Sequence, residues 1–217
     1  MTCALILPCR DEAAALVDLL PRVPEAFAPI VVDNGSSDRT ADVARSLGAR
    51  VVSEPTAGYG AAVHAGVLAA DTDLVAVMDG DGSMDPHDLL TLLEHVVAGD
   101  ATMAVGRRRP VRPGVWPWHA RLGNLLVLAW LRRRRGVTVR DIAAMRVCRR
   151  EDLLRLDVRD RRFGYPVELL QKASRAGWRV VEVDVGYDAR ARGTRSKVSG
   201  SLLGTVRTAR DFWRVLA

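Results

Sequence analysis

Short apolar runs alternate with helical stretches through the first half of this sequence, and that alternation limits the folds open to it. The runs CALILP, APIVVD, ARVVSEP, TDLVAVMD and ATMAVG each have the length and composition of a strand. The stretches between them, such as DEAAALVDLL and HDLLTLLEHVVAG, space their apolar residues as helices do. We therefore expect an α/β fold built of βαβ units, with helices on both faces of the sheet.

The length of 217 residues fits one well-packed domain, since a single core usually serves up to about 250 residues. No internal repeat or linker divides the sequence, so we expect one domain over residues 1–217. The cysteines are odd in number and contain no CxxC pair, which favours a reducing, cytoplasmic interior. The sequence shows no signal peptide, and no stretch reaches the ~20 apolar residues of a membrane span.

Charge divides the sequence into two halves. Residues 1–105 hold 5 basic and 16 acidic residues, whereas residues 106–217 hold 27 and 10. The acidic half could hold a cation, and the basic half could hold phosphates or an anionic membrane.

The fourth apolar run ends in Asp79 and Asp81, which only Gly80 separates. Residues two apart in an extended segment point the same way, so these carboxylates converge and repel each other unless a cation or a proton intervenes. Mg²⁺ and Mn²⁺ favour such oxygen ligands and complete their shell with phosphate oxygens. A solvated Asp-Gly turn is the alternative. Because the pair ends a buried strand, where α/β sheets bind ligands, we favour a metal site.

Charged residues also gather after the first two strands. Arg10, Asp11 and Glu12 follow the first strand, and Asp33 ends the second. The GxGxxG fingerprint of dinucleotide folds and the P-loop are both missing from the sequence. Carboxylates can hydrogen-bond a base or ribose while a metal neutralises a diphosphate. This combination favours a nucleotide-sugar site.

Local signals place several helix ends and the less regular second half. Ser36 or Ser37 is predicted to cap the helix DRTADVARSLG, and Asp85 the helix that begins at Pro86. The Pro- and Arg-rich stretch 107–118 predicts a long loop, followed by a helix over about 119–135. A helix over 166–177, a strand over 178–187 and a final helix over 201–217 are also expected. The final helix is basic and amphipathic, which suits a membrane surface or packing against the domain.

Longer segments of the sequence together resemble a known family. These are LPCRDEA, VVDNGSSDRTADVARSLGARVV, GYGAAVHAG, MDGDGSMDP, VRDIAAMRVCRR and FGYPVELLQKASRAGWRVVEVDVGYDARARGTRSKVSG. In this order they resemble family 2 glycosyltransferases of GT-A fold, above all the dolichol-phosphate mannose synthases and polyprenyl-phosphate glucosyltransferases. The resemblance covers nearly the whole chain and implies a single Rossmann-like α/β domain with a mixed, mostly parallel central sheet flanked by helices. It implies a nucleotide-sugar and metal-binding half over residues 1–105 and an acceptor-binding half over 106–217.

The resemblance also implies roles for individual residues. Asp79, Gly80 and Asp81 correspond to the DxD motif that binds the metal and the donor diphosphate, with Asp81 the more direct ligand. Further residues would line the nucleotide pocket: Pro8, Arg10, Glu12, Asp33, Gly58, Gly60 and Ala61. Others would face phosphates or the acceptor: Arg108, Arg121, Arg146, Arg195, Ser196 and Lys197.

The chemistry follows from the charge that must be stabilised. Breaking the sugar–diphosphate bond builds negative charge on the leaving nucleoside diphosphate, which a metal and nearby arginines such as Arg146 would stabilise. In-line attack inverts the anomeric centre. A phosphate acceptor is already anionic, whereas a hydroxyl acceptor needs a base, for which Asp141 is the first candidate and Glu168 the second. An ion pair of Asp141 with Arg140 or Arg146 is the alternative.

We therefore expect an inverting transferase that moves a hexose from GDP-mannose or UDP-glucose to a polyprenyl or dolichyl phosphate at the cytoplasmic face of the membrane. A soluble hydroxyl acceptor is one alternative, and a sugar-phosphate nucleotidyltransferase is another. A basic module that binds nucleic acid leaves Asp79 and Asp81 unexplained, so we expect no nucleic-acid partner. The sequence leaves the oligomeric state open.

Overall fold

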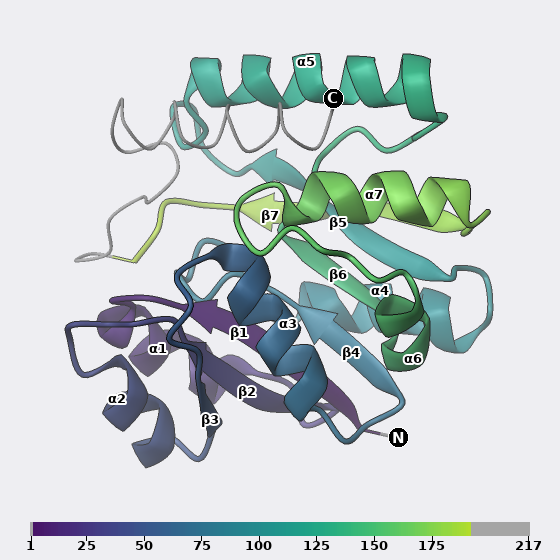
Figure 1. Ribbon diagram of the computed structural model, residues 1–217. Coiled ribbons are helices and arrows are strands. Elements are labelled where there is room, and N and C mark those ends of the chain that lie inside the picture. Colours follow the sequence, from purple (N-terminus) through teal and green to yellow (C-terminus); the bar gives the residue numbers. More distant parts are fainter. Residues whose placement is uncertain (1, 192–217) are drawn as a thin grey trace.

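Seven strands form one mixed sheet (Figure 1). They are β1 (Cys3–Cys9), β2 (Phe27–Asp33), β3 (Arg50–Ser53), β4 (Leu74–Val77), β5 (Met103–Pro110), β6 (Met145–Arg149) and β7 (Val180–Tyr187). Their order is β3-β2-β1-β4-β6-β5-β7, and only β6 runs antiparallel to its neighbours. The computed structural model describes residues 2–191, without the side chain of His119. The predicted mixed, mostly parallel sheet is confirmed.

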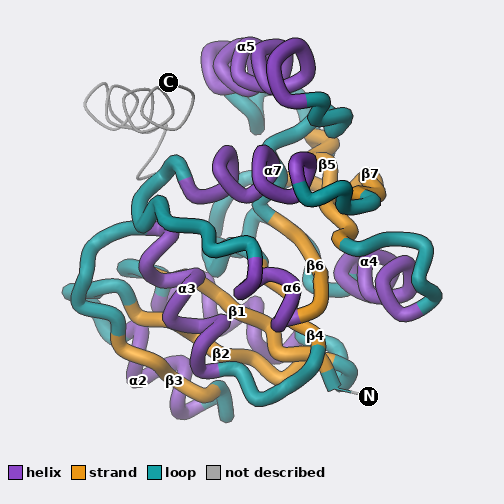
Figure 2. Tube along the Cα trace, turned by 45° about the vertical axis from the view of Figure 1, so that its right-hand side comes forward, coloured by secondary structure: helices purple, strands orange, loops and turns teal. Residues whose placement is uncertain are grey.

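Helices cover both faces of this sheet and enclose two cores (Figures 1 and 2). They are α1 (Ala13–Leu19), α2 (Thr40–Ser46), α3 (Tyr59–Ala69), α4 (Asp88–Val97), α5 (Trp118–Arg135), α6 (Arg150–Arg155) and α7 (Tyr165–Arg175), with a short 3-10 helix at Leu20–Arg22. Ile6 of β1 packs in the core under α3 and α7, and its neighbours Leu5 and Leu7 pack in the core under α1 and α4. Because β1 is buried on both faces, its sequence is continuously apolar.

The loop predicted over 107–118 begins later, because β5 continues to Pro110. Residues 103–110 pair in parallel with β7 along its whole length. Asp184 of β7 binds the guanidinium groups of both Arg107 and Arg109, at 2.9 Å for Arg109. The two arginines lower the pKa of Asp184 to about 2. This carboxylate offsets the like charges that made the segment look like a loop.

Both predicted helix caps are wrong. α2 begins at Thr40, and the serines instead join two loops: Ser36 Oγ accepts the N–H of Asp11, and Ser37 N–H donates to Asp11 Oδ1. α4 begins at Asp88 rather than at Pro86. Asp85 Oδ1 accepts the N–H of His87 in the turn that precedes the helix.

The structure also contains elements in a region to which the sequence assigned none, namely β6 and α6. The predicted final helix over 201–217 lies outside the described residues. Within residues 2–191, no helix combines the length and the apolar character needed to cross a membrane.

Candidate active site

The strand ends that carry the predicted site residues meet at one edge of the sheet. Cys9 and Asp33 are register partners at the ends of β1 and β2, and β4 ends beside them at Val77. Antiparallel β6 begins at the same edge, where Arg146 pairs with Val77. β5 and β7 also end there. In α/β sheets this carboxyl edge is where ligands bind.

The DxD segment follows β4 and lies against β1. Asp79 is partly buried, and Asp81 is only 4% exposed. Asp81 Oδ1 accepts the N–H of Ser83 at 3.0 Å. A Cβ on Gly80 would lie 2.3 Å from Sγ of Cys9, so only glycine lets the segment approach β1 this closely.

The two carboxylates are electrostatically frustrated. Burial and the negative charge of Asp81 raise the pKa of Asp79 to about 6, against the opposing charges of Arg190, Arg108 and Arg146. The residues between 2 and 191 include no group of three or more His, Cys, Asp and Glu side chains suited to a metal. Two carboxylates on a shared edge nevertheless fit a hard divalent ion that takes its other ligands from phosphate and water.

The structure predicts that Asp79→Asn stabilises the metal-free protein at pH 8, by about 1–3 kcal/mol. The folded pKa lies above the ordinary value, so the folded state holds this proton more tightly than the unfolded state. The stability that comes from this tighter proton binding is fully present below about pH 4 and is lost as the pH rises through about 6. At pH 8 Asp79 is ionised in both states, and its buried charge lowers the free energy of unfolding. Urea unfolding without metal should therefore show the advantage at pH 8 and none at pH 4.

The exposed Asp85 provides the control for this measurement, because Asp85→Asn removes an ion pair with Arg22 and should not stabilise the protein. An equal gain for Asp79→Asn at both pH values would contradict the electrostatic explanation.

Arg190 is a site residue that the sequence analysis did not single out. Its Nε lies 3.0 Å from Oδ2 of Asp81, where it supplies a cation to the carboxylate pair. Backbone hydrogen bonds hold this segment on the DxD turn, from Asp188 N–H to the carbonyl of Ser83 and from Ala191 N–H to the carbonyl of Asp81. The only sequence feature that pointed to Arg190 was its position in the basic stretch 188–200.

Arg146, for which the family resemblance implied contact with phosphates, is buried near the DxD pair. Its side chain is 2% exposed and donates to the carbonyl of Ala143 at 2.7 Å and to the hydroxyl of Tyr59 at 3.4 Å. Among the described residues, its buried Nε has no hydrogen-bond partner. Its charge lowers the pKa of Asp79, so the two groups are electrostatically linked.

Arg108 and Asp141 form a bidentate ion pair. The Asp141 side chain is 1% exposed and accepts hydrogen bonds from Nε of Arg108 at 2.8 Å and from a terminal nitrogen at 2.7 Å. The backbone N–H of Arg108 donates to the same carboxylate at 2.9 Å. Trp116 and Tyr187 lie against the guanidinium, with ring centroids at 4.4 Å and 5.5 Å. Arg108 is thus held at the ends of β5 and β7.

The expectation of a general base at Asp141 or Glu168 stays a prediction, although both side chains already have partners. Asp141 binds Arg108, not Arg140 or Arg146, and both of its oxygens are engaged. Glu168 of α7 accepts the N–H groups of Arg159 and Asp160 and binds Lys172. Both carboxylates therefore hold loops or side chains in place.

The glycine loop before α3 packs against protein rather than against open space. A Cβ on Gly58 would lie 2.1 Å from the carbonyl oxygen of Arg161, and one on Gly60 would lie 2.3 Å from that of Asp160. The N–H of Ala61 donates to the carbonyl of Arg161 at 2.8 Å. The glycines therefore let this loop pack closely against residues 160–161, and the expected contact of Gly58, Gly60 and Ala61 with the nucleotide stays a prediction.

Asn34 holds this loop to the sheet, and the sequence analysis missed it. Its side-chain NH₂ donates to the carbonyls of Glu54 and Thr56, and its Oδ1 accepts the N–H of Gly58. The signal in the sequence was an asparagine directly after the second strand, a position that here connects the ends of β2 and β3 to the loop before α3.

Of the other predicted site residues, some lie at the carboxyl edge of the sheet and others lie elsewhere. Pro8 and Asp33 lie at the ends of β1 and β2, and Asp33 Oδ1 accepts the N–H of Ser36. Arg10 is exposed, and the buried Glu12 donates its N–H to Thr40. Arg121 is exposed on α5. Arg195, Ser196 and Lys197 lie outside the described residues.

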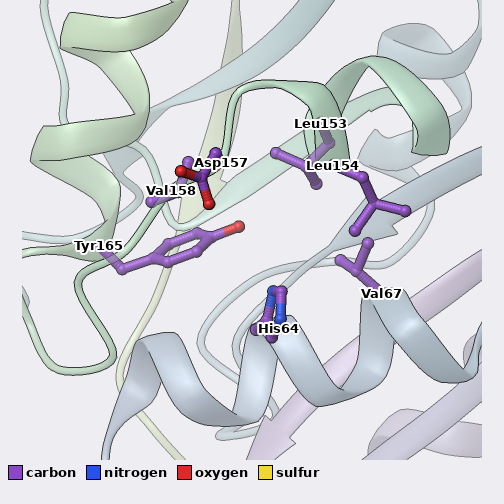
Figure 3. A pocket seen from close by; sticks show the side chains of 7 residues that line it. All are labelled: His64, Val67, Leu153, Leu154, Asp157, Val158 and Tyr165. Carbon is purple, nitrogen blue, oxygen red and sulfur yellow. The ribbon is translucent and has the colours of Figure 1, made fainter.

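A small cavity between α3, α6 and α7 is not the donor site. Its volume is about 40 Å³, and Figure 3 shows His64 and Tyr165 among its lining residues. Ligand pockets usually hold about 300–1,000 Å³, so this cavity has room for water rather than a nucleotide.

A sheet of this order, with a carboxylate pair after β4 and arginines around it, defines a glycosyltransferase of GT-A fold. Residues 4–156 match the family described as "Glycosyl transferase family 2", and the chain belongs to that family. A Mycobacterium tuberculosis protein described as an uncharacterized glycosyltransferase is 54% identical over 214 residues, which cover 98% of this chain and 97% of the relative.

Two further proteins resemble this chain at lower identity. The polyprenol monophosphomannose synthase of Mycolicibacterium smegmatis is 33% identical over 219 residues, covering 91% of this chain and 81% of the relative. The fold also matches a crystal structure of glucosyl-3-phosphoglycerate synthase from Mycobacterium tuberculosis in complex with Mn²⁺, UDP and glucosyl-3-phosphoglycerate. That match has a TM-score of 0.77 at 22% identity and covers 99% of this chain and 78% of the other.

Proposed function

We propose that this glycosyltransferase moves a hexose, with inversion, from a nucleotide sugar to a polyprenyl phosphate at the cytoplasmic face of a membrane. The observation that carries the proposal is the frustrated carboxylate pair Asp79 and Asp81 at the sheet edge, which Arg108, Arg146 and Arg190 surround. Such a site suits a metal and several phosphates. The 33% identical polyprenol monophosphomannose synthase supports a lipid phosphate as acceptor.

On this proposal Asp79 and Asp81 hold Mg²⁺ or Mn²⁺, with Asp81 the more direct ligand. When bound there, such an ion would supply positive charge for the leaving nucleoside diphosphate. Arg190 now neutralises Asp81, so metal binding would free its guanidinium for the donor phosphates. Arg146 is already buried near the pair, so its charge would act on the same phosphates. Pro8, Arg10, Glu12 and Asp33 would contact the nucleoside, of guanosine or uridine type.

The acceptor half favours a phosphate over a hydroxyl. Both candidates for a general base, Asp141 and Glu168, are engaged in internal contacts. A phosphate oxygen is anionic at neutral pH and needs no base. Arg108 and Arg121 would face the acceptor phosphate, together with Arg195, Ser196 and Lys197.

A soluble hydroxyl acceptor is the second candidate. The fold match to a synthase whose structure contains glucosyl-3-phosphoglycerate supports it. The same experiment tests both candidates.

The test measures nucleoside diphosphate release and product mass with GDP-mannose or UDP-glucose, with and without Mn²⁺. The acceptors are undecaprenyl phosphate, water-soluble farnesyl phosphate and 3-phosphoglycerate. We expect release only when metal and a prenyl phosphate are both present. Transfer to 3-phosphoglycerate with none to either prenyl phosphate would establish the second candidate instead. Pyrophosphate as the product would contradict both.

A further inference from the structure

The outer face of α5 carries a stripe of exposed apolar side chains. Trp118, Leu122, Leu125 and Leu126 are 76%, 46%, 60% and 63% exposed. Their spacing of four, three and one residues places them on one side of a helix. We call these four residues the α5 stripe.

The opposite face of α5 fixes the helix to the protein. Leu128 and Leu131 are buried in the same core as Leu169 and Leu170 of α7. Asn124 is buried as well, and its Oδ1 accepts the N–H of Ile142 at 3.1 Å. The stripe is therefore exposed because of how the helix packs, not because the helix is detached.

Other exposed apolar residues of the described chain are scattered. Val17, Leu68 and Val97 lie on three different helices. Single exposures of this kind are ordinary, whereas a contiguous apolar patch marks a surface with a partner. Figures 1 and 2 both place α5 at the outer limit of the described fold, so a large partner can reach it.

The charges on α5 indicate the chemistry of that partner. The helix contains no Asp or Glu, and Arg121, Arg132, Arg133 and Arg134 are exposed on it. Tryptophan and leucine on one face, with arginines beside them, are the composition of helices that lie in the interface of an anionic membrane.

Two other occupants of the stripe are less compatible with these charges. Residues 192–217 of the chain contain six basic residues and one acidic residue, so their charge repels the arginines of α5. A second copy that packs α5 against α5 would bring two sets of arginines together. An anionic bilayer complements them instead.

We propose that the α5 stripe docks this protein on the surface of an anionic lipid bilayer. The docking itself does not depend on the proposed function. Only its purpose, the delivery of a lipid acceptor, rests on that function. Trp116 stacks on Arg108 two residues before Trp118 begins the stripe, so docking brings the Arg108 end of the site toward the lipid headgroups.

Flotation of the full chain with vesicles tests the proposal. One set of vesicles contains phosphatidylcholine with phosphatidylglycerol, and the other contains phosphatidylcholine alone. Wild-type protein should float with the anionic set and less so as salt increases, because salt screens the arginines. The triple variant Leu122→Gln, Leu125→Gln and Leu126→Gln should bind at least about tenfold more weakly.

The matched control is Val17→Gln, Leu68→Gln and Val97→Gln, which removes three equally exposed apolar side chains elsewhere and should bind like wild type. All six positions are exposed, so both variants should fold. Transfer to water-soluble farnesyl phosphate should be the same in all three proteins, while transfer to undecaprenyl phosphate in vesicles should fall only in the α5 variant.

Wild-type binding by the α5 variant would overturn the proposal. A cross-link between α5 and residues 192–217, or a dimer that the α5 variant alone dissociates, would overturn it in favour of another occupant. Vesicle binding by wild type without transfer to any prenyl phosphate would leave the docking surface intact and refute the proposed acceptor.

Discussion

Asp81→Asn is expected to lower kcat/KM by about 10³-fold, equivalent to about 4 kcal/mol of transition-state stabilisation. Asp81 is the buried member of the pair, and on the proposed mechanism its charge would hold the metal that supplies positive charge for the leaving diphosphate. The asparagine oxygen can still accept the N–H of Ser83, so the turn should keep its shape. The loss should therefore be chemical rather than structural.

A metal titration of the Asp81→Asn variant provides the sharper measurement. If the charge acts by holding a metal, the variant should need a higher Mn²⁺ concentration for half-maximal rate, and excess Mn²⁺ should restore part of the activity. Asp85→Asn makes the same chemical change at an exposed position four residues along and should alter the rate little. Full activity of Asp81→Asn at limiting Mn²⁺ would refute the mechanism.

The strands that could be predicted are those whose sequence pattern depends only on their own residues. Continuous apolar runs identify strands that are buried on both faces, such as β1 and β4, because their residues serve two cores. The end of β5 was not predictable in this way. Arg107 and Arg109 continue the strand beside β7, where Asp184, 77 positions after Arg107, offsets their charges.

The site residues differ in the same way: some can be predicted from the local sequence, and others depend on tertiary contacts. Asp79 and Asp81 could be paired from sequence because they lie two residues apart directly after an apolar strand, although the structure places them in a turn rather than in an extended segment. Arg190 was missed because only tertiary folding brings the end of β7 over that turn. The packing of Gly58 and Gly60 against residues 160–161 was missed, because a position that needs a small residue gives the same sequence signal whether a ligand or a backbone carbonyl lies beside it.

Asp141→Asn is expected to lower kcat/KM by about 10- to 100-fold and the free energy of unfolding by about 2–4 kcal/mol. The carboxylate is buried, and Arg108 would lose the counter-charge that orients its guanidinium beneath Trp116. If Arg108 faces the acceptor phosphate, the loss should appear mainly in KM for the acceptor. Steady-state kinetics and urea unfolding measure the two effects separately.

A double-mutant cycle decides whether Asp141 acts through Arg108 or as a base in its own right. Arg108→Lys keeps the charge but cannot match both carboxylate oxygens. If Asp141 only positions Arg108, the double variant should be about as active as Arg108→Lys alone, and its pH profile should keep the wild-type acid limb. If Asp141 were the base, the two losses would multiply and the acid limb would disappear from every variant that lacks it. Because both oxygens of Asp141 already bind Arg108, we expect the first result.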